Sequence, residues 1–179
     1  MSESTSTYPL FLRHLVRGYA LIGGIGLIAA AIITVISVVA RGVGADAISG
    51  DFELVELATG IAVFSFLPWG HMVGAHVQVD VLAARFGTRF YRALGVVSNA
   101  LIAVVAVVIL WRLYLGFAEK FPYGPEPLRE ILAMGAKPFF PETTYELQVP
   151  MWVPYGFCLV GAFLFVLVAI ARLVADIKG

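Results

Sequence analysis

The stretch that decides the fold runs from Glu53 to Asp80 and reads ELVELATGIAVFSFLPWGHMVGAHVQVD. Its central part, Leu57–Ala75, contains no Lys, Arg, Asp or Glu. A helix rises about 1.5 Å per residue, so this run nearly crosses a hydrocarbon core of roughly 30 Å. Pro68 removes a backbone donor and predicts a kink in the helix. Gly70 and Gly74 predict a bare helix face on which another helix packs closely.

The composition of the chain is that of a membrane protein. Hydrophobic residues make up 60% and charged residues 13% of the 179 residues, and the mean hydropathy is +0.92. Soluble domains carry about 25% charged residues. Lys and Arg together number 12, as do Asp and Glu, so no net charge points to a nucleic acid. The single cysteine, Cys158, lies in an apolar run and is interpreted as a packing residue.

Four uncharged runs predict four membrane-spanning helices. The first run, Gly18–Ala40, is longer than the apolar core of a secretory signal, so we expect it to be retained as a span. The predicted fold class is therefore an all-α membrane protein that forms one domain over residues 1–179. The expected spans are approximately residues 18–41, 54–76, 92–117 and 150–173.

The basic residues predict the orientation of these spans. Seven of them flank the helix ends that share a side with both termini, and Lys and Arg concentrate in short cytoplasmic flanks. We therefore expect both termini to lie in the cytoplasm. Arg112 is left on the outer side, where it would reach water from a helix end. The seven residues are Arg13, Arg17, Arg85, Arg89, Arg92, Arg172 and Lys178.

Two connections between the spans have features of their own. After the second span, residues 79–86 carry an apolar stripe, which predicts a short helix lying at the membrane interface. Between the third and fourth spans, Ala118–Val149 is the longest connection and is expected on the outer side. Within it, Glu126–Met134 is predicted to form a short helix, because Pro127 suits a helix start and Gly135 suits a helix end.

The sequence contains no GxSxG, HExxH, P-loop or CxxC motif. His71 lies at membrane depth, which allows a proton relay or a metal ligand. The favoured interpretation is a neutral histidine, because no second His or acid lies one turn away. Glu53 and Glu56 open the second span, where the helix dipole favours acids, although a cation site is the other interpretation. Asn99 is predicted to bond another helix rather than a substrate. We therefore expect no catalytic, cofactor-binding or metal-binding residue.

The end of the opening stretch carries the most specific signal. Residues 76–80, HVQVD, resemble the H-V-x-V-D signature that follows the second transmembrane helix in the small permease subunit of TRAP (tripartite ATP-independent periplasmic) transporters, the DctQ-like family. An acid that opens the second helix also fits this family, and it is either Glu53 or Glu56. The residues that match the signature are His76, Val77, Val79 and Asp80.

The resemblance implies a transport subunit without catalysis. In such systems a large permease subunit holds the substrate and sodium ions and moves as an elevator, and a periplasmic binding protein delivers the substrate. The small subunit is a scaffold for the large one during sodium-coupled uptake of a carboxylate or sulfonate across the bacterial inner membrane. The implied partners are the large permease subunit, the periplasmic substrate-binding protein and membrane lipids. No cofactor is implied for this chain, because sodium coupling belongs to the large subunit.

Two surfaces are predicted to meet these partners. Small residues in the first two spans offer faces for close packing with the large subunit, and they are Gly23, Gly26, Gly70 and Gly74. Mixed charges and aromatic residues in the outer loop suit docking of the binding protein. The docking candidates are Glu126, Arg129 and Glu130. The alternative is that Leu128, Ile131, Phe139 and Phe140 only cover the outer ends of this chain's own helices or those of the large subunit.

Two other functions stay open as alternatives. A stand-alone small four-helix transporter would need a membrane-embedded acid to exchange protons, and no acid lies inside any of the four runs. The other alternative is a membrane anchor subunit of another complex. This chain lacks the residues that an intramembrane protease or a haem protein would need.

Overall fold

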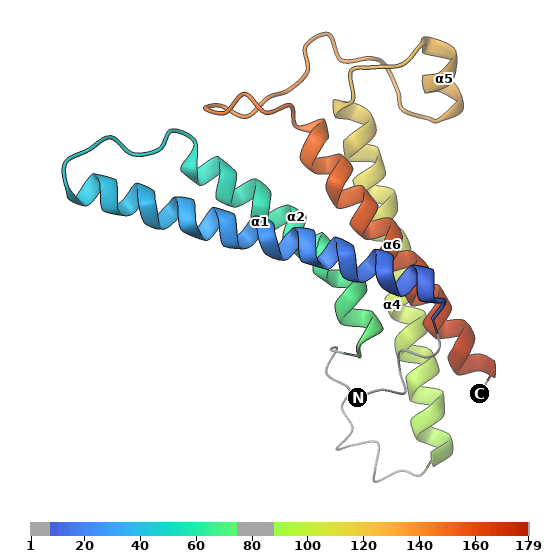
Figure 1. The fold of residues 1–179 in the computed structure, drawn as a ribbon. Helices are drawn as coiled ribbons and strands as arrows, with labels where there is room; N and C mark the ends of the chain where they lie inside the picture. Colours follow the sequence, from blue (N-terminus) through green and yellow to red (C-terminus); the bar gives the residue numbers. More distant parts are fainter. Residues whose placement is uncertain (1–7, 75–87, 179) are drawn as a thin grey trace.

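The computed structural model of the chain describes residues 8–74 and 88–178, and the helices of this part are shown in Figure 1. Over these residues the chain forms helices and no strand, apart from a single bridge between Thr143 and Pro150. The helices are α1 (Leu10–Gly42), α2 (Asp51–Met72), α4 (Thr88–Lys120), α5 (Glu126–Ile131) and α6 (Trp152–Lys178).

Four of these helices are long and apolar enough to cross a membrane. They are α1, α2, most of α4 and α6, so the prediction of an all-helical chain with four candidate spans is confirmed. α1 contains 33 residues, which corresponds to about 50 Å and exceeds a hydrocarbon core of roughly 30 Å. A helix of this length lies tilted in a bilayer or extends beyond the hydrocarbon.

α1 begins at Leu10, well before the expected start of the first span. The charged turn that contains Arg13 and Arg17 is therefore helical as well. Pro9 occupies the N-cap with φ −55° and ψ 140°, an extended conformation that lies outside the helix. The hydrophobic run marks the part of a helix that fits the lipid, and the helix itself continues until a local signal ends it.

α2 ends at Met72, four residues before the expected end of the second span. Gly74 lies beyond the helix with φ +71°, and its N–H donates to the carbonyl of His71 at 3.2 Å. A glycine in this left-handed conformation is a common helix stop. Gly70 and Gly74 therefore do not share a helix face, and that prediction is wrong. The predicted interfacial helix after this point lies outside the described residues.

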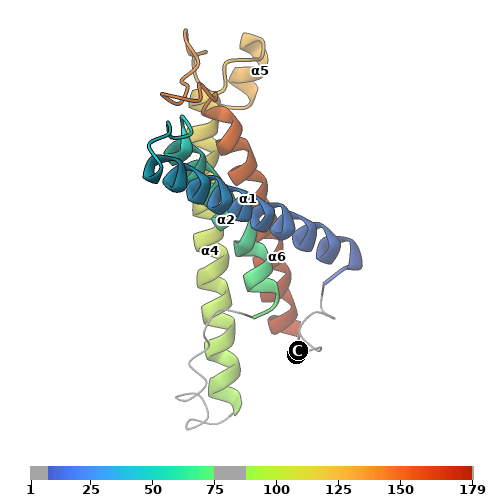
Figure 2. The ribbon, with the colours of Figure 1, turned by 60° about the vertical axis from the view of Figure 1, so that its left-hand side comes forward.

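The helices are arranged as two antiparallel pairs that cross. α1 packs against α2, α4 packs against α6, and α2 packs against α6 (Figures 1 and 2). At the crossing of α2 and α6, a Cβ on Gly161 would overlap the backbone carbonyl of Phe64. Close contact of this kind is what small residues allow between helices in lipid.

α6 is the helix that both pairs share. One core cluster joins it to α1 and α2, and a second joins it to α4. The first cluster consists of Tyr8, Val16, Met72, Leu164 and Val168. The second consists of Ala103, Ala106, Phe165, Val166 and Ala169. In the most apolar window of α6, 39% of residues are buried, against 17% in each of the other three spans, so α6 is the centre of the packing.

Two glycines of α1 that are three residues apart have different surroundings. A Cβ on Gly23 would lie 2.6 Å from Cβ of Ser65 on α2, whereas a Cβ on Gly26 would meet nothing within 4 Å. The structure therefore places Gly23, a predicted subunit contact, inside the chain's own α1–α2 contact. Gly26 stays available to a partner.

We predict that Gly23→Leu destabilises the isolated chain, because the added side chain forces α1 away from Ser65. Overpacking typically costs about 1–3 kcal/mol. The melting temperature of the purified chain in detergent measures the effect. Gly26→Leu is the matched control and should leave that temperature unchanged. Equal melting temperatures for the two variants would contradict the assigned α1–α2 contact.

Candidate functional site

A reciprocal set of contacts ties the start of α2 to the segment before α6. The carboxylate of Glu53 accepts hydrogen bonds from the backbone N–H groups of Glu146 at 2.8 Å and Leu147 at 3.0 Å. The carboxylate of Glu146 accepts one in turn from the N–H of Gly50. We call Gly50, Glu53, Glu146 and Leu147 the outer latch. It joins two parts of the chain that are far apart in sequence.

Gly50 of the outer latch has to be glycine for two reasons. Its φ is +77°, which strains any residue with a side chain, and a Cβ there would lie 2.5 Å from Cγ of Leu147. Glu56, the other acid near the start of α2, is exposed and makes no hydrogen bond or ion pair within the described part of the chain. Of the two acids, Glu53 is thus the one with a structural role.

A second polar cluster closes the turn between α1 and α2. The carboxylate of Asp51 is buried and accepts hydrogen bonds from Ser37 Oγ at 2.6 Å and Arg41 Nη2 at 2.8 Å. A buried carboxylate needs such partners, because removing its charge from water is costly. This cluster was not predicted from the sequence. Its signal was a Ser and an Arg one helical turn apart, followed after a short turn by an Asp.

Arg129 organises the outer loop from the inside. It is 2% exposed, and its N–H groups donate to six backbone carbonyls, at distances between 2.7 and 3.2 Å. These carbonyls belong to Ala118, Phe121, Tyr123, Met134, Gly135 and Ala136. The turn that brings the last three together contains Ala133 with φ 51° and Gly135 with φ 68°. Arg129 was predicted to contact a binding protein, and instead its guanidinium is enclosed by this loop.

Three large apolar side chains of the same loop are exposed. Ile131 is 81% exposed, Phe139 is 91% exposed and Phe140 is 77% exposed. The rings of Phe139 and Phe140 form an edge-to-face pair, with centroids 4.7 Å apart. These residues therefore do not cover the outer ends of the chain's own helices. Glu126 and Glu130 on α5 are exposed as well.

Several buried polar residues of the spans contact other helices of the chain. Asn99 of α4 donates to the carboxylate of Asp176 on α6, which confirms the prediction that it bonds another helix. Nε of Arg172 lies 3.6 Å from Oδ1 of the same carboxylate. His71 is 5% exposed, and the ring of Phe165 on α6 approaches it edge-on with centroids 5.7 Å apart. Within the described part, no three His, Cys, Asp or Glu residues gather where they could hold a metal ion.

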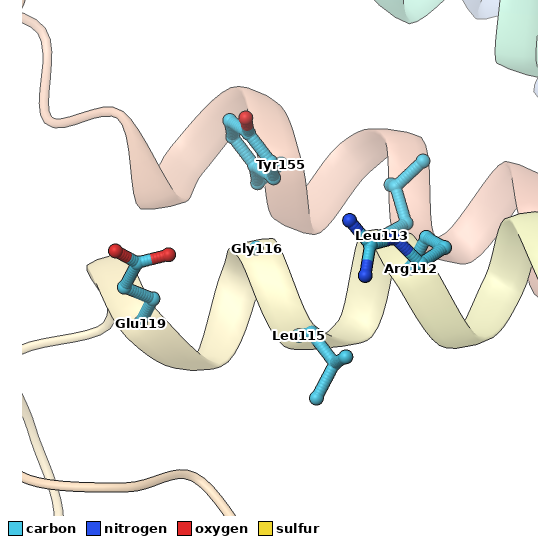
Figure 3. Close-up of a pocket in the computed structure, with 6 residues that line it drawn as sticks. All are labelled: Arg112, Leu113, Leu115, Gly116, Glu119 and Tyr155. Atoms are coloured by element: carbon cyan, nitrogen blue, oxygen red, sulfur yellow. The ribbon is translucent and has the colours of Figure 1, made fainter.

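A shallow cavity of about 470 Å³ lies between the last part of α4 and the first part of α6. Figure 3 shows Arg112 and Glu119 of α4 on either side of Gly116, with Tyr155 of α6 facing the gap. Arg112 is exposed in the helix eight positions before its last residue, Lys120. It therefore lies about 12 Å along the helix from that end, whereas the sequence predicted a position at the helix end itself.

The remaining predicted site residues fall into two groups. The signature residues His76, Val77, Val79 and Asp80 lie outside the described residues, so their roles stay predictions. Gly26 and Gly70 have open space around them, since a Cβ on either would meet nothing within 4 Å. They are the two predicted interface glycines that the structure leaves accessible on a helix.

Four apolar helices, joined to one another through polar contacts of their buried residues, define a multi-pass helical membrane protein. Residues 30–179 match the family model described as "Tripartite ATP-independent periplasmic transporters, DctQ component". The chain belongs to this family and is a small membrane component of a TRAP transporter. No curated protein and no solved structure matches it.

We predict that Arg129→Lys loosens the outer loop without unfolding the spans. A lysine has three N–H donors in place of five, so it leaves some of the six carbonyls unpaired at about 1–3 kcal/mol each. Limited proteolysis in detergent should then cut between residues 118 and 136 faster than in the parent chain. Glu130→Gln, an exposed change on the same helix, is the control. Identical cleavage rates for Arg129→Lys and the parent chain would contradict this role.

Proposed function

We propose that this chain is the stationary scaffold of a TRAP transporter. In this proposal it holds a large elevator-type permease subunit during sodium-coupled, binding-protein-dependent uptake of an organic acid, a carboxylate or a sulfonate. The observation that carries the proposal is the family match over residues 30–179. The substrate and the sodium ions are bound by the large subunit, and this chain has no catalytic role.

The internal contacts of the chain support a part that does not move. The outer latch ties α2 to the segment before α6, Asp51 ties α2 to α1, and Asn99 ties α4 to α6. A transport site is commonly formed by interrupted helices near the middle of the membrane. Within residues 8–74 and 88–178, the four spanning helices are continuous. This favours a scaffold over a stand-alone transporter.

The large subunit is proposed to pack on the open glycines of the first two helices. Gly26 of α1 and Gly70 of α2 have no neighbour within 4 Å of a Cβ. Much of the apolar surface around Gly26 is uncovered, with Ile25 67% exposed and Ile28 63% exposed. Lipid tails and protein side chains are equally apolar, so close shape fit at small residues decides where two helices associate in a membrane.

We predict that Gly26→Leu and Gly70→Leu each reduce recovery of the complex with the large permease subunit, because the added side chain holds the partner helix off. Co-purification with a tagged large subunit measures the recovery of the complex. Gly42→Leu, which adds the same side chain in open space at the end of α1, is the control. Melting temperatures of the isolated variants should stay normal. Full recovery of the complex from both variants would remove these glycines from the interface.

The proposed localisation is the bacterial inner membrane with both termini in the cytoplasm. Arg13, Arg17 and Arg172 lie near one end of the helix set, as the positive-inside rule favours for the cytoplasmic side. Tyr8 packs against Met72 and Val168, so the start of α1 lies beside the end of α2 and the last part of α6. The outer loop leaves from the opposite ends of α4 and α6 (Figure 1).

The outer loop is proposed to form part of the docking surface for the periplasmic binding protein. Glu126 and Glu130 supply exposed negative charge on α5, and Phe139 and Phe140 supply exposed aromatic surface. A partner that arrives, delivers its substrate and leaves suits a small surface of mixed character. Arg129 supports this surface from below and is not part of it.

We predict that the double variant Glu126→Lys, Glu130→Lys lowers uptake at limiting binding-protein concentration by about tenfold at low salt, because it reverses the charge that steers the encounter. Assembly with the large subunit should be unchanged. Asp46→Lys, an exposed acid in the turn between α1 and α2, is the control. Labelling of Lys137→Cys by a membrane-impermeant thiol reagent tests separately that the loop lies outside. Unchanged uptake with normal assembly would leave the loop with a structural role only.

A further inference from the structure

The cavity between the last part of α4 and the first part of α6 carries two opposite charges, and neither forms an ion pair within the described part of the chain. Its volume is about 470 Å³, and it is open along one side of the two helices. Arg112 lies on its inner side and Glu119 on its outer side, while the ring of Tyr155 faces Gly116 between them (Figure 3). We call the space lined by Arg112, Gly116, Glu119 and Tyr155 the headgroup cavity.

Arg112 of the headgroup cavity is unusual for a residue of a membrane span. It is exposed, and it lies about 12 Å below the end of α4. Within the described part of the chain, its guanidinium makes no hydrogen bond and no ion pair. An arginine near the hydrocarbon is costly unless an anion or water reaches it. The position therefore calls for an anionic group, and residues 8–74 and 88–178 do not supply one.

Glu119 lies seven residues after Arg112, which is two helical turns and about 10 Å along the same face. It is exposed and also makes no ion pair among the described residues. The ammonium of its neighbour Lys120 binds Glu142 at 2.5 Å and lies 5.8 Å from the centre of the Tyr155 ring, and its charge is also attracted to that of Glu119. The cavity thus offers a cation on its membrane side and an anion on its water side.

The ring of Tyr155 packs against Gly116 between these two charges. A Cβ on Gly116 would lie 2.6 Å from the ring of Tyr155, so a side chain at this position would push the ring away from α4. Tyrosine is also a residue that prefers the level of lipid headgroups, since its ring is apolar and its hydroxyl is polar. A tyrosine beside the last turns of α4 is therefore the kind of residue expected where a span meets the headgroup region.

We propose that the headgroup cavity binds an amine-bearing zwitterionic phospholipid, with its phosphate on Arg112 and its ammonium on Glu119. In such a lipid the phosphate is joined next to the acyl chains and the amine lies beyond it, which is the order of the two charges in the cavity. A guanidinium binds phosphate through two parallel hydrogen bonds. The headgroup assignment does not depend on the proposed function, and only the choice of the outer leaflet rests on the proposed orientation.

A lipid fits these charges better than a partner protein does. An acidic side chain of another subunit would neutralise Arg112 and leave Glu119 without a counter-charge. A zwitterionic headgroup satisfies both with one molecule, because the long Arg and Glu side chains close part of the distance between their backbones. Pockets with basic residues between transmembrane helices are known sites for lipid headgroups.

Native mass spectrometry of the isolated chain in detergent tests the proposal. The chain is titrated with phosphatidylethanolamine and, separately, with phosphatidylglycerol, which has a phosphate but no amine. We expect the parent chain to retain phosphatidylethanolamine better. Arg112→Gln should lower retention of both lipids by about tenfold, the size expected for one lost charge-assisted contact. Glu119→Gln should lower retention of phosphatidylethanolamine alone. Lys137→Gln, an exposed charge change in the outer loop, should change neither.

Three results would overturn the proposal. Unchanged lipid retention by Arg112→Gln, together with weaker recovery of the large subunit, would assign Arg112 to an acidic residue of that partner. A preserved preference for phosphatidylethanolamine in Glu119→Gln would remove the amine contact. Displacement of the lipid by equimolar phosphoethanolamine would identify a soluble phosphate compound as the ligand. Normal melting temperatures of both variants would show that the losses are not caused by unfolding.

Discussion

The structure depends on one close crossing, where the backbone of α2 meets Gly161 of α6. The carbonyl of Phe64 lies where a side chain at position 161 would have to be. The two helix pairs are also joined by the apolar cluster of Val16, Met72 and Val168, by the hydrogen bond from Tyr19 to the carbonyl of Phe157, and by the outer latch. In lipid, helices are held by shape and polar contacts, since the bilayer supplies no hydrophobic force between them. A residue without a side chain at this crossing therefore fixes how both pairs are arranged.

The polar groups that reinforce this arrangement lie toward the ends of the helices. Asp51, with Ser37 and Arg41, joins α1 to α2 beside the outer turn, and Asp176 joins α6 to Asn99 near the other end. Toward the helix ends a charge can keep part of its contact with water, so that an ion pair does not carry the full cost of desolvation. The middle of the helices is left to apolar and small residues. This division leaves the outward faces apolar and free to meet lipid or a second protein.

The sequence was sufficient for the number and the approximate place of the spans, because backbone groups in lipid must be satisfied within each helix. It was insufficient for contacts between distant residues. Glu53 and Glu146 are 93 residues apart, and no local pattern connects them. Arg129 was misjudged because a charged residue in a loop is usually exposed, and only the converging carbonyls reveal that it is enclosed. Gly74 ended α2 by its left-handed conformation, although its spacing from Gly70 suggested a helix face.

The outer loop combines fixed attachment points with an exposed tip. It is held to α4 by the hydrogen bond from Tyr114 to the carbonyl of Leu132, and by the ion pair of Lys120 with Glu142. The outer latch holds its last part to α2. Phe139 and Phe140 lie between these attachments and remain exposed. A surface that is already fixed at both sides loses little conformational entropy when a partner binds, and large aromatic side chains then contribute most of the contact.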